Sequence, residues 1–125
     1  MTRQGYIVDE HQIDGAGLRV RVYLGERDKH HGKALWSTLL ELLRREGAAG
    51  ATVTRGVAGY GAHSKIHTAS IVDLSSDLPL VVEWIDTEER VGRLLPAIEE
   101  MLQGGLITTD PVRIIRYQPH TDRIS

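Results

Sequence analysis

A glycine-rich segment and the polar stretch after it hold the residue types best suited to ligand binding. Residues 50–61 read GATVTRGVAGYG, and residues 62–77 carry two histidines and a lysine. Backbone N–H groups in the Gly59-Tyr60-Gly61 run could bind a phosphate, because glycine lets a ligand approach the main chain closely. Lys65 follows nearby and would add positive charge. A β-bulge and a turn would use the same glycines, so spacing alone leaves both interpretations open.

Two arginines near the end of the chain could complete such an anion site. Arg113 and Arg116 lie in an apolar segment that reads as a strand, and we expect them to point to the exposed face of a sheet. In a symmetric oligomer they would meet the glycine segment of a neighbouring subunit. The alternative is that they form surface ion pairs with Glu83 or Asp86.

The histidines offer a different chemistry. His63 and His67 are four residues apart, a spacing that lets two histidines share a metal on a helix, and His30 could contribute as well. Their segment lacks a helical pattern, so exposed loop histidines are the favoured interpretation. The serines of this stretch stand in no nucleophile-elbow pattern, and GVAGYG opens no helix as a dinucleotide fingerprint would. We therefore expect no enzyme.

Composition narrows the function classes. The chain has 125 residues with 15 basic and 17 acidic side chains, a net charge of −2, which disfavours nucleic acid as the main partner. It contains no cysteine, so disulfides, thiolate catalysis and cysteine-based zinc sites are excluded. No apolar run approaches the ~20 residues of a membrane helix, and no signal peptide is evident. We expect a cytoplasmic protein without membrane insertion.

Hydrophobic periodicity predicts one α+β domain between an N-terminal extension (1–17) and a C-terminal tail (118–125). Strict alternation predicts a strand over 18–24, and helical spacing predicts helices over 33–46 and 86–103, the second capped by Asp86. The other expected elements are an edge strand near 6–8 and strands over 51–57, 78–85 and within 106–117.

The order β-α-β-β-α-β is the ferredoxin-like pattern, a four-stranded antiparallel sheet with both helices on one face. Several strands carry apolar or long side chains toward both faces. The face without helices therefore needs cover, which predicts self-association through the sheet.

Three stretches carry a family resemblance: HGKALWSTLLELLRREGAAGATVTRGVAGYG, SKIHTASIVDLSSDLPLVVEWID and GLITTDPVRIIRY. Over about residues 18–117 the sequence resembles the domain-of-unknown-function 190 family of the PII-like signal-transduction superfamily. The resemblance implies a trimer packed through its sheets. It also implies a mobile T-loop over 62–77, where a rigid hairpin is the alternative, and adenine nucleotides bound in clefts between subunits.

The resemblance also implies which residues bind the nucleotide. These are Thr52 and the Gly59-Tyr60-Gly61 run of one subunit, with the Gly105 turn and Arg113 of the next. The stretch 62–77 has no tyrosine, so the uridylylation site of the nitrogen-regulatory members is missing. GLITTDP lacks their phosphate-binding lysine, which makes AMP or ADP a better candidate than ATP.

The predicted function is a non-enzymatic, trimeric sensor that signals through its loop to a partner protein such as a transporter or channel. One alternative is a metal-binding trimer resembling the divalent-cation-tolerance proteins, with His63, His67 or His30 as ligands. Another is a structural trimer without a small ligand.

Overall fold

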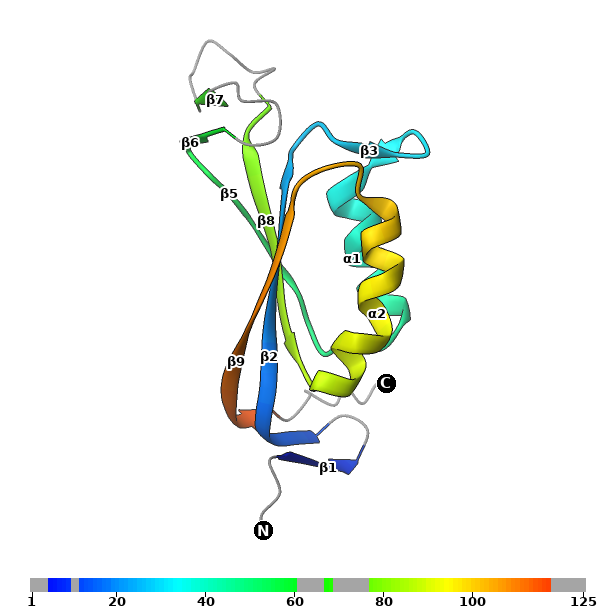
Figure 1. The fold of residues 1–125 in the computed structure, drawn as a ribbon, viewed down its shortest axis with the longest axis vertical. Helices are drawn as coiled ribbons and strands as arrows, with labels where there is room; N and C mark the ends of the chain where they lie inside the picture. The colour runs from blue at the N-terminus through cyan, green and yellow to red at the C-terminus, as the bar shows by residue number, and fades with distance from the viewer. Residues whose placement is uncertain (1–4, 10–11, 61–66, 69–76, 118–125) are drawn as a thin grey trace, which may run out of the picture.

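The computed structural model describes residues 5–9, 12–60, 67–68 and 77–117. It confirms the predicted α+β architecture: two helices lie side by side on one face of an antiparallel sheet (Figure 1). The helices are α1 (Leu35–Arg45) and α2 (Glu88–Met101). The long strands are β2 (Gln12–Gly25), β8 (Pro79–Asp86) and β9 (Leu106–Tyr117). The shorter strands are β1 (Gly5–Asp9), β3 (Lys29–His30), β4 (Lys33–Ala34), β5 (Thr52–Arg55), β6 (Ala58–Gly59) and β7 (His67–Thr68).

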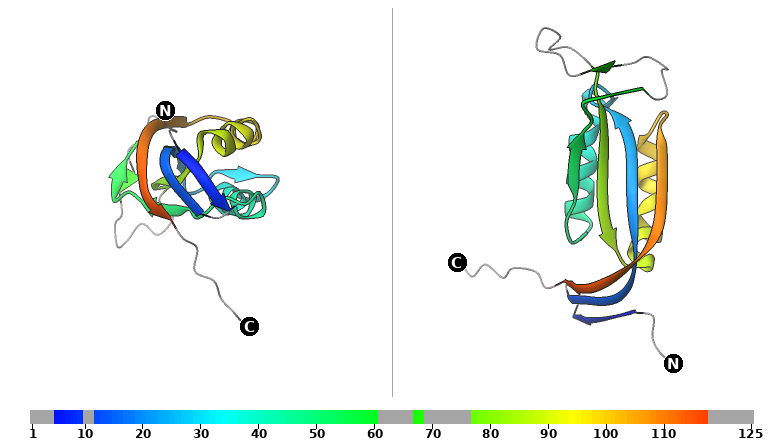
Figure 2. Two further views of the ribbon diagram at one scale, coloured as in Figure 1. Left: turned by 90° about the horizontal axis from the view of Figure 1, so that it is seen from below. Right: turned by 90° about the vertical axis from the view of Figure 1, so that its left-hand side faces the viewer.

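The strand order across the sheet is β9-β2-β8-β5, with all neighbours antiparallel. This is the order of the ferredoxin-like fold, with the central strands β2 and β8 flanked by β9 at one edge and β5 at the other. The right-hand view in Figure 2 looks onto the open face of the sheet, with its two edge strands at the sides and the helices behind it. The register places Val22 opposite both Val82 and Ile107.

The core lies between the sheet and the helices. From Val20 to Leu24 on β2 and from Leu80 to Trp84 on β8, every second side chain is buried there, as the alternating pattern predicts. The buried set comprises Val20, Val22, Leu24, Leu80, Val82 and Trp84 from the strands, with Leu35, Leu39, Leu42, Leu43, Val91, Leu94 and Ile98 from the helices. The apolar stripes of both predicted helices thus face the sheet.

The start of α2 corrects one prediction. Thr87, not Asp86, caps the helix: its side chain accepts a hydrogen bond from the N–H of Arg90. Asp86 is the last residue of β8 and is fully buried. Its carboxylate accepts from the N–H of Thr87 at 2.8 Å and pairs with Nε of Arg90 at 3.0 Å. Asp86 therefore joins the strand to the helix from inside the core.

Strand β2 is longer than the predicted 18–24. It begins at Gln12, inside the predicted extension, where it pairs with β1 over the register Gly5↔Gly15 to Asp9↔Gln12. The predicted edge strand near 6–8 is thus confirmed. Because β9 occupies the other edge of β2, β1 occupies the edge that β8 takes from Leu18 onward.

The segment between β2 and α1 contains a hairpin, β3–β4, with His30 opposite Lys33. His31 and Gly32 between them have φ of 51° and 82°. Positive φ at both central positions is typical of the type I′ turn that closes two-residue hairpins. Glycine at the second position, Gly32, adopts its positive φ without steric cost.

Candidate functional site

The glycine segment packs tightly where the sheet ends. Gly56 donates its N–H to the carbonyl of Pro79 at 2.8 Å. A Cβ built on Gly56 or Gly59 would lie 2.9 or 3.0 Å from the Pro79 ring. These two glycines thus allow the backbone to pack closely against Pro79. Beside them, Tyr60 is 70% exposed and does not contribute to the core.

The turn Gly25–Asp28 holds both flanks of the long polar stretch. The N–H of Glu26 donates to the carbonyl of Leu78 at 2.8 Å, and the N–H of Arg27 donates to Oδ1 of Asp77 at 2.8 Å. Arg55, at the end of β5, donates from Nη2 to Oε2 of Glu26 at 2.5 Å. The residues before and after this stretch are therefore tied to one turn. No sequence motif indicated these contacts.

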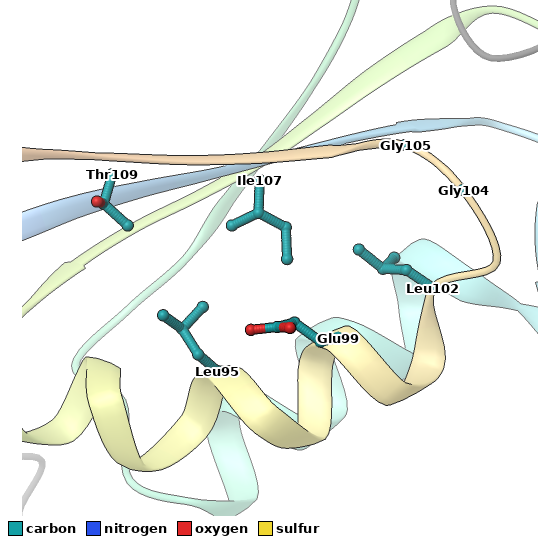
Figure 3. A pocket seen from close by; sticks show the side chains of 7 residues that line it. All are labelled: Leu95, Glu99, Leu102, Gly104, Gly105, Ile107 and Thr109. Carbon is teal, nitrogen blue, oxygen red and sulfur yellow. The ribbon is translucent and has the colours of Figure 1, made fainter.

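A second glycine turn, Gly104–Gly105, leads into β9. Gly105 has φ of 109°, and a Cβ on it would lie 2.6 Å from the carbonyl oxygen of Tyr23, so the position requires glycine. A cleft of about 530 Å³ adjoins this turn between α2 and β9. In Figure 3 Glu99 points into the space between Leu95 and Ile107. The cleft is lined by Leu95, Glu99, Leu102, Gly104, Gly105, Ile107 and Thr109.

The two glycine turns lie at the same end of the sheet but at opposite edges. Gly59 contacts the start of β8 next to edge strand β5, and Gly105 contacts the end of β2 at the start of edge strand β9. Three strand spacings of about 4.8 Å separate the edges, or about 14 Å. Figure 2 shows β5 and β9 on opposite sides of the open face. Within one chain, the sheet therefore keeps the two halves of the predicted site apart.

Thr52 and Arg113 lie elsewhere on these edges. Thr52 is exposed on β5 opposite Glu83, about 10 Å along the strands from the level of Arg55. Arg113 is exposed on β9 opposite Ala16, eight residues beyond Gly105 and thus roughly 25 Å along the strand. Gly105 and Arg113 of one chain therefore cannot contact the same phosphate.

The side of the sheet on which Arg113 lies follows from its position along β9. Asp110 and Thr108 lie on the open face with Arg19 and Arg21, and alternation puts Arg113 on the opposite side of β9. The alternative ion pairs of Arg113 are absent among the described residues, because Glu83 pairs with Arg21 and Asp86 pairs with Arg90.

The remaining predicted site residues lie on other elements or outside the described residues. Arg116 lies in β9, near its end. His67 lies in β7, opposite Gly59. Gly61, Lys65 and His63, together with most of the predicted loop 62–77, lie outside the described residues. His30 stacks on His31, with ring centroids 4.0 Å apart and planes at 19°.

The open face carries two ion pairs across neighbouring strands. Arg19 donates to both oxygens of Asp110, at 3.2 and 2.7 Å, and Nε of Arg21 donates to Oε1 of Glu83 at 2.9 Å. The hydrogen bond from Arg19 lowers the pKa of Asp110, and the hydrogen bond to Glu83 raises the pKa of Arg21. These four charged side chains on the open face therefore neutralise one another.

The described residues offer neither a cluster of metal ligands nor a membrane-spanning helix. In the ranges that the structure describes, no three side chains of the types His, Cys, Asp or Glu are grouped so that they could hold a metal ion. Over the same ranges, neither helix has the length and apolar character needed to cross a bilayer.

Known proteins resemble this chain in sequence and in structure. The family model of the domain of unknown function 190, described as an uncharacterized ACR, matches residues 17–114. A UPF0166 protein of Methanocaldococcus jannaschii is 38% identical over 73% of this chain and 85% of its own length. A UPF0166 protein of Aquifex aeolicus is 40% identical over 77% and 90%.

Among solved structures, the chain is similar to CPII of Thiomonas intermedia, a nitrogen regulatory PII-like protein bound to ADP, AMP and bicarbonate. The TM-score is 0.57 with 20% identity, over 79% of this chain and 88% of that one, a likeness that shows the fold. The matched family model covers the sheet and both helices from the middle of β2 into β9. The chain belongs to the domain-of-unknown-function 190 family and has the PII-like, ferredoxin-like fold.

Proposed function

We propose that this protein is a cytoplasmic, non-enzymatic PII-like regulator that binds an adenine nucleotide (AMP, ADP or ATP) between the subunits of a homotrimer. The sequence family and the fold support a member of the PII-like group. The structural neighbour CPII was solved with ADP and AMP, which makes adenine nucleotides the first ligands to test.

One observation carries the proposal: the two glycine turns lie at the same end of the sheet but at opposite edges. A single ligand can contact both only if edge β5 of one chain faces edge β9 of the next. Such a contact joins two different surfaces, and contacts of this type generate closed rings when the rotation closes. The ring that the family resemblance implies is a trimer with three equivalent sites.

The proposed site combines two sets of residues. One chain supplies Thr52 and the Gly59-Tyr60-Gly61 run with Lys65, and the next supplies Gly105 beside the α2–β9 cleft. The exposed ring of Tyr60 is suited to stack on a base, and a turn of two glycines gives a phosphate access to backbone N–H groups. Arg113 and Arg116, at the far end of β9, are left for other contacts of the neighbouring chain.

Signalling is proposed to run through residues 62–77 to a partner protein such as a transporter or channel. Support comes from the flanks of this stretch, which are tied to the turn that follows β2, next to the proposed site. A ligand at the proposed site would thus lie beside the turn after β2, which contacts Arg55 ahead of residues 62–77 and Asp77 at their end.

Light scattering and calorimetry test the proposal. We expect a trimer mass at micromolar concentration and binding of AMP, ADP or ATP. Tyr60→Ala should weaken nucleotide binding at least several-fold without changing the mass, since its ring is exposed. Val57→Ala, a change at a residue that is 78% exposed in the same segment, is the matched control.

A monomer, or a protein that binds none of the three nucleotides, would contradict the proposal. Titration with divalent cations tests the metal alternative in the same experiment. Metal binding that is lost in His63→Ala, without nucleotide binding, would favour that alternative.

A further inference from the structure

Arg55 lies at the same height along the sheet as the Gly105 turn. Arg55 is opposite Leu80 on β8, and Leu80 is opposite Leu24 on β2. The preceding residue of β2, Tyr23, is opposite Leu106, and because β2 and β9 are antiparallel, Gly105 lies at the level of Leu24. The two residues therefore mark the two ends of one line across the sheet.

This line becomes important in a closed ring. Cyclic symmetry is a pure rotation without translation along its axis, so every residue lies at the same height along the axis in all chains. Two residues of equal height in one chain can therefore face each other across the contact between neighbouring chains. In a ring whose axis runs along the strands, Arg55 of one chain faces the Gly104–Gly105 turn of the next. Arg113 lies at the far end of β9 and does not.

We propose that Arg55 binds the phosphate of the nucleotide and that Glu26 is its partner in the empty site. This inference rests on the proposed function and assigns the phosphate to a residue that the sequence did not single out. The Arg55 side chain is 60% exposed, so the guanidinium is accessible at the edge. Arginine is well suited to bind phosphate, because its planar fork donates two parallel hydrogen bonds.

Glu26 then competes with the ligand. The phosphate and the Glu26 carboxylate are both anionic acceptors for the Arg55 guanidinium. Binding of the phosphate to Arg55 therefore weakens the ion pair between Arg55 and Glu26. Glu26 sits in the turn whose backbone donates to Leu78, and the neighbouring Arg27 N–H donates to Asp77. Occupancy of the site is thereby linked to Asp77 and Leu78, at the C-terminal end of residues 62–77.

The test uses the full-length protein with ADP and adenosine as probes, which differ only in the phosphates. Arg55→Ala should weaken ADP binding about tenfold to a hundredfold, as expected for the loss of a charge-assisted hydrogen bond, and leave adenosine binding unchanged. Glu26→Gln removes the competing charge, so it should tighten ADP binding by a measurable factor and leave adenosine unchanged.

Two controls match these variants. Arg45→Ala removes an arginine from another exposed pair, with Glu46 at 3.9 Å on α1, and should leave ADP binding as in the parent protein. Arg113→Ala should also leave it unchanged. Light scattering and thermal unfolding establish that every variant remains an assembled, folded protein.

The outcomes separate the two proposals. If the parent protein binds neither ADP nor adenosine, the proposed function fails. If the parent binds ADP and Arg55→Ala binds it equally well, the role of Arg55 is overturned and the proposed function stands. Equal losses for ADP and adenosine would assign Arg55 a structural role and also overturn the inference, as would weaker ADP binding by Glu26→Gln.

Discussion

The two faces of the sheet are built from alternate residues of the same strands, yet they follow different rules. On the helix side, β2 and β8 bury valine, leucine and tryptophan. On the open side, the same strands carry Arg19, Arg21 and Glu83, paired with charges on neighbouring strands or with each other. One face stabilises the single chain. On the other face, the charges of Arg19, Arg21, Glu83 and Asp110 pair with one another, so a second chain could cover these four side chains without leaving any of them unpaired.

Two aspartates make this contrast quantitative. Asp86 and Asp110 each pair with an arginine, Asp86 with no exposure and Asp110 with 42% of its side chain exposed. Breaking a buried pair leaves an uncompensated charge in the interior, whereas an exposed pair is largely replaced by water. Breaking an aspartate–arginine pair should therefore lower the free energy of unfolding strongly at the buried Asp86 and only slightly at the exposed Asp110.

The largest effect is expected from Asp86→Ala. Removing the carboxylate takes from Arg90 its partner at 3.0 Å and from Thr87 the acceptor of its N–H. We expect a loss of about 3–5 kcal/mol in the free energy of unfolding. Urea denaturation followed by circular dichroism measures it. A loss below 1 kcal/mol would mean that the helix start does not depend on this pair.

Next in size is a pair of truncations on β8. Leu80 is 4% exposed on the helix side, and Ile85 is 40% exposed on the open side. Leu80→Ala should cost about 2–5 kcal/mol, because it leaves a cavity in the core. Ile85→Ala should cost less than about 1 kcal/mol in a dissociated chain, because most of its surface is already in water. Equal costs in denaturant titrations would show that the faces do not differ in the single chain.

The open face is probed more directly by a charge reversal. Arg21→Glu places two carboxylates opposite each other, since Glu83 is the partner of Arg21. If this face is covered in the trimer, the concentration at which subunits dissociate should rise at least tenfold, because like charges across or within an interface are unfavourable. Light scattering over a dilution series measures it, and Arg21→Glu combined with Glu83→Arg should restore assembly. Unchanged dissociation would place the interface elsewhere.

The smallest effect concerns pH. Arg19 lowers the pKa of Asp110 in the folded protein, so this pair contributes stability above the ordinary aspartate pKa of about 3.9. That contribution is lost as the pH falls through the lowered folded value. The parent protein should thus exceed Asp110→Asn slightly in unfolding free energy from pH 7 to pH 5, and the two should converge in stronger acid. Urea titrations at several pH values measure this. A gap that persists into strong acid would contradict the assignment.

The fold could be predicted from the sequence because its signals are local. Alternation in β2, helical spacing in α1 and α2, and the βαββαβ order are all readable from neighbouring residues. The errors arose where tertiary contacts decide. Asp86 matched a capping pattern, but the buried pair with Arg90 keeps it in β8 and leaves the cap to Thr87.

The candidate site was less predictable for the same reason. Gly59 stood out because glycine allows close approach to the main chain, and Gly105 was indicated by the family resemblance. Both do approach neighbouring chain segments closely. Arg55 and Glu26 are 29 residues apart and fit no motif, so only the folded sheet reveals their contact. The side of the sheet that Arg113 occupies could not be predicted, because an isolated strand pattern does not say which side the helices cover.

The central position of β2 has a consequence for folding during synthesis. Its long partners are distant in sequence, because Leu18 pairs with Asp86 on one side and with Pro111 on the other. At roughly 5–20 residues per second, the ribosome makes β2 several seconds before β8 exists. Meanwhile only β1 can pair with it. The strand at the centre of the finished sheet is therefore the one that waits longest with unpaired edges, and such non-local pairing slows folding and favours aggregation.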